Sequence, residues 1–164
     1  MNKIQAVKTA KIEEVKKNSK KGFTLVELVV VIAILAILAA IAIPVVSSTI
    51  ASSQRSGALS DAQTLELALK EAQAQIVAKD TSAGYTSAST VANVISTKSL
   101  QGIKYTVKIG STDYTLKWNH TDDKCYYVDT SGNNLDTNVT PGADSSPYTF
   151  DATNNATQTV IGLF

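Results

Sequence analysis

A single carboxylate lies inside the most apolar stretch of this chain. Glu27 is the only charged side chain between residues 23 and 46, and most of its neighbours there are aliphatic. A helix of this length spans about 36 Å, which is enough to cross a bilayer hydrocarbon core of about 30 Å. A charge near the bilayer centre costs roughly 2.5–3.5 kcal/mol on insertion scales, so Glu27 is a candidate functional group. It either waits near the helix end for a positive partner, or it reaches the lipid headgroups and needs none.

Two simpler interpretations of the apolar stretch stay open. An ordinary secretory signal has an apolar core of about 7–15 residues. The stretch here is longer, although Ala40-Ile41-Ala42 could mimic a small-x-small cleavage site. A plain transmembrane helix fits the length but does not explain why a charged residue, Glu27, lies in the stretch.

The remaining reactive side chains do not form a catalytic set. His120 is the only histidine and lies in the polar run NHTDD, which predicts a solvated turn residue. Cys125 is the only cysteine, so no disulfide can form within the chain, and we predict a small buried residue in a strand. The sequence holds no nucleophile–base pair, phosphate-binding loop or metal-ligand spacing. We therefore predict that the protein is not an enzyme and that it needs no metal.

Aspartates in the C-terminal third of the chain could form a metal site, although their spacing supports this only weakly. Asp122 and Asp123 could supply oxygen ligands for calcium, as could a second run of four side chains: Asp129, Ser131, Asn133 and Asp136. The spacing lacks the glycine and the bidentate glutamate of an EF-hand, so polar turns are favoured. The sequence therefore predicts a protein without a cofactor, and calcium binding in these C-terminal loops is the less favoured alternative.

The charge of the chain is divided unevenly. The net charge is +1, yet residues 1–22 carry seven lysines and two acids, which gives that segment +5 and the rest of the chain −4. A mildly acidic main part argues against binding to nucleic acid. A basic segment before an apolar stretch is typical of the cytoplasmic side of a membrane segment.

A second helical pattern follows the apolar stretch. Apolar residues recur at spacings of four and three along one stripe, which predicts an amphipathic helix: Ala58, Ala62, Leu65, Leu69, Ala72 and Ile76. We expect one continuous helix from Thr24 to Ala78, ending near Ala78–Gly84 with glycine as the stop signal. Pro44 lies inside this helix, removes one backbone donor and predicts a kink or a local break.

The pattern changes to strands after residue 101. Residues 85–101 predict a short helix, N-capped by Ser87 or Ser89, that turns Val91, Val94 and Ile95 inward. Alternating apolar residues then predict an antiparallel meander of three strands at 103–109, 114–118 and 124–129. Its apolar face requires cover, which the stripe of the amphipathic helix supplies.

Residues 130–164 are rich in turn-forming residues. Short strands are predicted at Tyr148–Phe150 and Thr159–Phe164. Three Asn-x-Ser/Thr triplets, which begin at Asn119, Asn138 and Asn155, arise easily by chance in a region rich in threonine and asparagine.

The junction between the basic and the apolar segments carries a family resemblance. The run K-K-G-F-T-L-V-E at residues 20–27, followed by an apolar stretch with a proline near its end, resembles the class III signal and N-terminal helix of type IV prepilins and pseudopilins. The resemblance implies that a prepilin peptidase cuts between Gly22 and Phe23 and then N-methylates Phe23. Glycine suits such a site, because a residue without Cβ lets a protease approach the backbone closely. Removal of 22 residues from 164 leaves a mature chain of 142.

The resemblance also assigns a role to Glu27. In the family, the carboxylate at this position is thought to pair with the new terminal amine of a neighbouring subunit and to set the axial register of the filament. Such a pair would neutralise two charges in a low-dielectric bundle, where one unpaired charge would be costly. Pro44 would be the place where the packed helix loosens or extends.

The implied architecture is α+β, with a long N-terminal helix packed on a small antiparallel β-sheet head. Residues 1–22 form the cleaved cytoplasmic leader, 23–46 the transmembrane and filament-core helix, and 47–79 its amphipathic continuation. Residues 80–164 form the αβ-loop and the antiparallel sheet with its polar C-terminal region. Many family members close that region with a disulfide. The single Cys125 departs from this pattern and favours a Gram-positive bacterial pilin, closed by strand pairing, by a metal or by neither.

The implied function is that of a structural subunit, a major pilin of a type IV pilus. Its expected partners are copies of itself, the prepilin peptidase, the pilus assembly platform with its ATPase, and membrane lipid before assembly. It is expected in the cell membrane, with the head outside, and afterwards in the extracellular filament. A pseudopilin of a secretion or competence system is the alternative within this machinery. A membrane-anchored binding module that never polymerises is the alternative from another class.

Overall fold

The computed structural model describes residues 23–80, 82 and 84–164. The predicted leader, residues 1–22 with Gly22, lies outside the described residues. The described chain divides into two units, of which the first ends at Val46 and the second comprises Ser47–Phe164. Both units receive residues from helix α2, which comprises Leu25–Val77. This helix agrees closely with the continuous helix predicted from Thr24 to Ala78.

Within the second unit, α2 buries one stripe of small and aliphatic side chains. The predicted residues from Ala58 to Ala72 are buried together with Ala68, and Ile76 is half-buried. The helix ends before the predicted glycine signal, because Lys79 adopts a left-handed backbone with φ of 55°. The amide of Asp80 then donates to the carbonyl of Gln75 at 2.9 Å, which satisfies a carbonyl of the last turn.

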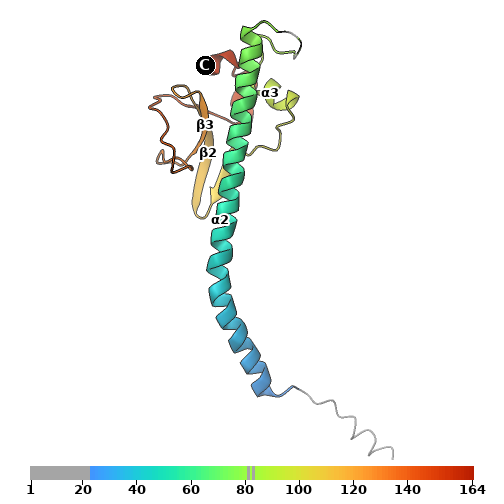
Figure 1. The fold of residues 1–164 in the computed structure, drawn as a ribbon, viewed down its shortest axis with the longest axis vertical. Coiled ribbons are helices and arrows are strands. Elements are labelled where there is room, and N and C mark those ends of the chain that lie inside the picture. The colour runs from blue at the N-terminus through green and yellow to red at the C-terminus, as the bar shows by residue number, and fades with distance from the viewer. Residues whose placement is uncertain (1–22, 81, 83) are drawn as a thin grey trace, which may run out of the picture. The chain divides into compact units, whose positions relative to one another are not determined.

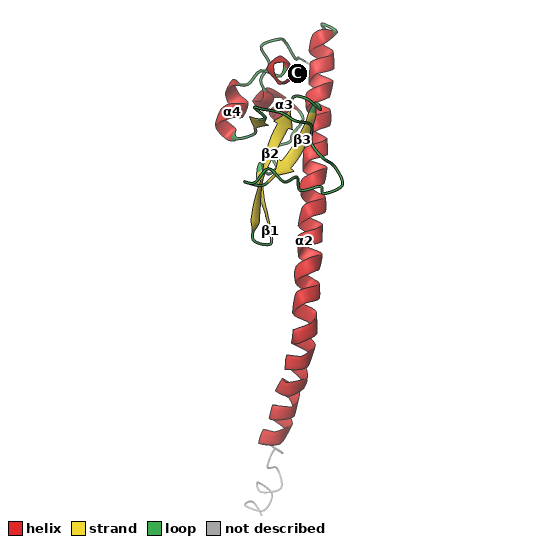
Figure 2. Ribbon diagram, turned by 90° about the vertical axis from the view of Figure 1, so that its left-hand side faces the viewer, coloured by secondary structure: helices red, strands yellow, loops and turns green. Residues whose placement is uncertain are grey.

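The sheet of the second unit is built around its longest strand. The strands are β1 (Thr106–Ile109), β2 (Thr112–Asn119), β3 (Lys124–Val128) and β4 (Tyr148–Thr149). All pairings are antiparallel, and β3 pairs with one edge of β2. Strands β1 and β4 pair with successive parts of the other edge. Figures 1 and 2 show β2 and β3 beside the upper half of α2. The predicted three-stranded meander is confirmed.

The core lies between this sheet and the stripe of α2. Cross-strand neighbours on the inner face are Leu116 with Tyr127 and Trp118 with Cys125, and all four are buried. Their alternation along the strands is the predicted one, since successive residues of a strand point to opposite faces. Cys125 is buried as predicted, and this burial raises the pKa of its thiol.

Helix α3 comprises Val91–Thr97 and confirms the short helix predicted in this region. Its inward residues are the predicted valines and isoleucine, but the predicted N-cap is wrong. Thr90 caps the helix and forms a capping box with Asn93. The Ser89 hydroxyl instead accepts a hydrogen bond from the amide of Thr86 at 2.9 Å. The serine is therefore used in the preceding turn.

The C-terminal region contains one predicted strand and two helices that were not predicted. Strand β4 lies within the predicted segment 148–150. The strand predicted at Thr159–Phe164 is wrong: the segment holds an isolated bridge between Thr90 and Thr159 and the 3₁₀ helix η1 (Ile161–Leu163). Before it lies α4 (Ala152–Thr157), whose first amides donate to the side chain of Asp151. The carbonyl of Leu163 accepts a hydrogen bond from Trp118 Nε1 at 2.7 Å, which ties the chain end to the core.

A network of hydrogen bonds holds the C-terminal loop. We call it the polar clasp, formed between residues 119–122 and residues 142–144. Asn119 Nδ2 donates to the carbonyl of Gly142 at 2.7 Å, and Thr121 Oγ1 donates to the carbonyl of Ala143 at 2.9 Å. The amide of Gly142 donates to the Asp122 carboxylate. A Cβ at Gly142 would lie 2.5 Å from Asp122 Oδ1, so the clasp requires glycine there.

Two contacts between Asp144 and His120 complete the clasp. Asp144 Oδ2 accepts from the amide of His120 at 2.8 Å and lies 2.9 Å from His120 Nδ1. The backbone amides of His120 and Ser146, followed by the His120 side chain, lower the pKa of Asp144 to about 2. His120 is exposed in a turn, as predicted. The C-terminal region is thus held by strand pairing, by Trp118 and by the clasp.

Candidate functional site

The first unit exposes an apolar helical surface. Every residue from 23 to 50 is exposed, and each large apolar side chain between 23 and 46 exposes at least half of its surface. Phe23 exposes 86%. Within the described residues, α2 is the one helix long and apolar enough to cross a membrane by length and composition. An apolar surface of this extent is typical of a segment that lipid or another protein covers.

Glu27 caps the N-terminus of its own helix. Its Oε2 accepts hydrogen bonds from the amide of Thr24 at 2.8 Å and from the Thr24 hydroxyl at 2.7 Å. In return the amide of Glu27 donates to Thr24 Oγ1 at 3.2 Å. The carbonyl of Thr24 accepts the first helical hydrogen bond, from Leu28. This reciprocal pattern is a capping box, which satisfies amides that the first turn of a helix leaves without partners.

The sequence itself contains the signal for this capping box. Thr-x-x-Glu directly before an apolar run is the signature of a capping box. Thr24 is therefore the residue that sequence reasoning missed. It fixes the Glu27 carboxylate beside the start of α2, where the partial positive charge of the helix N-terminus favours an anion.

Only one oxygen of Glu27 takes part in the capping box. Among the described residues, Oε1 accepts no hydrogen bond, and no hydrogen bond or ion pair joins Phe23 to Glu27. A carboxylate has about four acceptor positions, so capping leaves room for a further donor. The site can therefore hold its helix end and accept a cationic group at the same time.

Of the predicted site residues that the structure describes, Pro44 lies far from Glu27. Gly22 lies outside the described residues. Pro44 is 17 positions further along the same helix, which corresponds to about 26 Å along the axis. Helix α2 continues through Pro44, so its role as a point of loosening stays a prediction.

Asp129, one of the aspartates considered for calcium, forms local hydrogen bonds. The Asp129 carboxylate accepts hydrogen bonds from the amides of Ser131 and Asn133, each at 2.8 Å, and from Asn133 Nδ2 at 2.9 Å. Hydrogen bonds from the Asn133 side chain and amide are the main causes that lower the pKa of Asp129. In the part of the chain that the structure describes, no three His, Cys, Asp or Glu residues form a group that could hold a metal ion.

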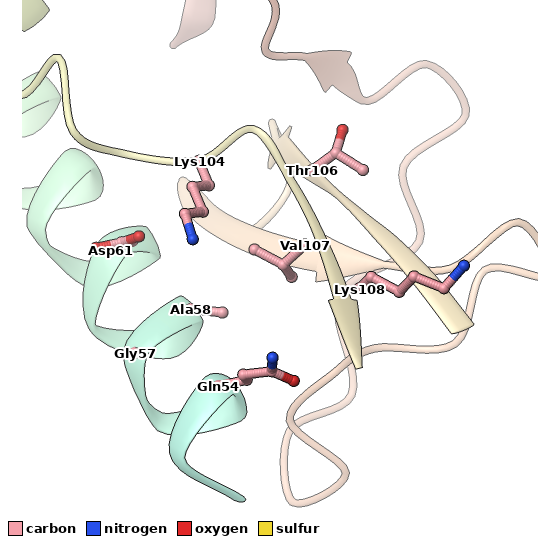
Figure 3. Close-up of a pocket in the computed structure, with 8 residues that line it drawn as sticks. All are labelled: Gln54, Gly57, Ala58, Asp61, Lys104, Thr106, Val107 and Lys108. Atoms are coloured by element: carbon pink, nitrogen blue, oxygen red, sulfur yellow. The ribbon is translucent and has the colours of Figure 1, made fainter. Parts of the chain in front are cut away.

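A pocket of about 410 Å³ opens between α2 and the β1 segment (Figure 3). Lys104 extends from one wall toward the helix, and Asp61 and Gln54 lie on the opposite wall. The charged residues of the lining are Asp61, Lys104 and Lys108, and its one hydroxyl is that of Thr106.

Comparison with known proteins identifies the N-terminal region. Residues 17–43 match the family described as the prokaryotic N-terminal methylation motif. This motif is the class III signal peptide of type IV pilins, and it indicates a chain processed in the manner of type IV pilins or pseudopilins. The match includes the Gly22–Phe23 junction and Glu27. No curated protein and no solved structure matches the chain.

Proposed function

We propose that this chain, which carries the N-terminal methylation motif of type IV pilins, is the major structural subunit of a type IV pilus. A prepilin peptidase removes residues 1–22 and methylates the new amine of Phe23. The mature subunit is held in the cell membrane by the apolar part of α2. The assembly platform and its ATPase then transfer it into an extracellular filament made of copies of this chain.

The contrast between the two parts of α2 carries this proposal. The stripe from Ala58 to Ala72 is covered by the sheet of its own unit, whereas the apolar residues from Phe23 to Val46 are exposed. Lipid covers such a surface in the membrane, and equivalent helices of other subunits cover it in a filament. Five alanines in the exposed segment would allow close approach of helices: Ala33, Ala36, Ala39, Ala40 and Ala42.

In a filament assembled in this way, each subunit is related to the next by the same screw operation, a rotation combined with a translation along the axis. Like subunits that join head to tail form an open fibre, since nothing closes the interface on itself. The methylated amine of Phe23 is cationic, and Glu27 of a neighbour offers an oxygen that the capping box does not use. Pairing of the two charges would fix how far each subunit enters the bundle.

The N-terminus of the mature protein tests the proposed processing. We expect a chain that begins at Phe23, has 142 residues and is one methyl group heavier than the unmodified sequence. The measurement is the intact mass of the protein from membranes and filaments, with fragmentation of its N-terminal peptide. A start after Ala42 would show an ordinary secretory signal, and a chain that retains Met1–Gly22 would contradict processing by a prepilin peptidase.

A further inference from the structure

The three Asn-x-Thr triplets are alike in sequence and different in structure. N-linked glycosylation uses the side-chain amide of asparagine in Asn-x-Ser/Thr and occurs at the protein surface. An acceptor triplet must therefore present both its amide and its hydroxyl to an enzyme. The structure separates the triplets by this criterion.

The triplet at Asn119 is not available. Asn119 exposes only 6% of its surface and ends strand β2. Its Nδ2 donates to Gly142, and its Oδ1 accepts from the amides of Thr121 and Asp122 at 2.8 and 3.1 Å. The hydroxyl of Thr121 donates to Ala143. A glycan on this amide would break the polar clasp.

The asparagine of the triplet at Asn155 is buried as well. Asn155 exposes 2% of its surface and lies inside α4. Its Oδ1 accepts from the Tyr148 hydroxyl at 2.9 Å. The hydroxyl of Thr157 donates to the carbonyl of Asn154 at 3.1 Å. The Asn155 side chain is therefore inaccessible, and the Thr157 hydroxyl is already bonded to the backbone of α4.

The triplet at Asn138 has an exposed asparagine, and its two functional side chains are not engaged by residues that the structure describes. Asn138 and Thr140 are exposed, and they lie in a loop outside the helices and strands. Among the described residues, neither the Asn138 amide group nor the Thr140 hydroxyl makes a hydrogen bond. The loop is held at its base instead: Asp136 Oδ1 accepts from the backbone amide of Asn138 at 3.0 Å, and Asn134 Nδ2 donates to the carbonyl of Val139 at 2.9 Å.

We propose that Asn138 is the acceptor of an N-linked glycan. The co-reactant is an oligosaccharide joined through its C1 atom to a lipid diphosphate. The Asn138 Nδ2 atom forms a bond to C1, the bond between C1 and the diphosphate oxygen breaks, and the lipid diphosphate leaves with that electron pair. The amide loses one proton, which balances the charge of the leaving group. No oxidant or reductant is required.

Protein purified from the native cell, without exposure to glycosidases, tests this proposal. No lysine or arginine follows Lys124, so trypsin leaves Asn138 and Asn155 in one peptide. Cleavage before aspartate separates them, because the triplets then fall in peptides that begin at Asp113, Asp136 and Asp151. We expect mass spectrometry to find a glycan on the Asp136 peptide, lost in Asn138→Gln and Thr140→Ala and retained in Thr140→Ser. The other two peptides should be unmodified.

An unmodified Asp136 peptide in protein from the native cell would overturn the proposal, as would a glycan found only at Asn119 or Asn155. Retention of the glycan in Thr140→Ala would also contradict it, because recognition would then not require the triplet. The readout is the mass of a head peptide and can be measured on membrane-held subunits. It is therefore independent of whether filaments form.

Discussion

Cells that carry Glu27→Ala in this chain will retain the subunit in the membrane and will form no filaments. The substitution removes the only charge of the apolar stretch, which makes insertion easier. In the filament it would leave the amine of a neighbouring subunit buried without a partner. Breaking a buried pair in this way costs about 3–5 kcal/mol, which reduces subunit incorporation by about 100-fold or more.

Two matched variants separate the charge of Glu27 from its capping role. Glu27→Gln keeps an acceptor for Thr24, since glutamine also serves at this position of a capping box. We expect it to abolish filaments, because it has no charge. Thr24→Val keeps the carboxylate but removes the capping hydroxyl, at a cost of about 0.5–2 kcal/mol. We expect this variant to assemble.

The measurement is the amount of subunit in sheared surface filaments relative to the amount in membranes. Normal filaments from Glu27→Gln would show that capping, and not charge, is what assembly requires. Normal filaments from Glu27→Ala would remove Glu27 from the assembly mechanism.

Replacement of Trp118 by alanine will lower the free energy of unfolding of the head by about 3–5 kcal/mol. Trp118 lies in β2 and is completely buried. Its ring packs edge-on against Phe164 with centroids 4.8 Å apart, and its Nε1 donates to Leu163. The substitution therefore opens a cavity and also releases the C-terminal segment, which no disulfide retains.

Denaturant unfolding of the full chain in detergent measures this effect. The near-ultraviolet circular dichroism of tyrosine is a suitable signal, because all six tyrosines lie in the second unit. Trp118→Phe keeps most of the volume and should lose about 1 kcal/mol with the hydrogen bond. Leu67→Ala is the surface control, since Leu67 is 67% exposed, and should stay within about 0.5 kcal/mol of the parent. A loss below about 1 kcal/mol in Trp118→Ala would contradict the described core.

Periodic features of the fold were predictable because they depend on local spacing. The stripe of α2 and the alternation of Leu116 and Trp118 each place apolar residues on one face, whatever the partner is. Burial of Cys125 followed from its position in such a strand. An apolar stripe on a helix and an apolar face on a sheet each require cover, so their packing against one another was also predictable.

Features that depend on competition between similar residues were not predictable in this way. Ser87, Ser89 and Thr90 can all cap a helix, and the choice of Thr90 depends on its reciprocal bonds with Asn93. The end of the chain has a strand-like composition, yet Asp151 starts a helix before it and Trp118 captures the carbonyl of Leu163.

In the candidate site and in the clasp, too, some features could be predicted from the sequence and others could not. The apolar length and the charge of Glu27 could be interpreted from the sequence, because both follow from transfer energies. The capping box is also present in the sequence, as Thr24-x-x-Glu27, because it depends only on local spacing. The polar clasp joins residues about 20 positions apart, and no local pattern predicts that Gly142 will meet Asp122.

Electron microscopy of filaments sheared from the surface of native cells, with the subunit identified by mass, tests the central claim most directly. The claim is that copies of this chain polymerise through the exposed apolar part of α2. We predict helical filaments in which this chain, beginning at Phe23, is the most abundant protein. Cells that hold the processed chain only in the membrane, with surface filaments built from another protein or absent, would contradict it.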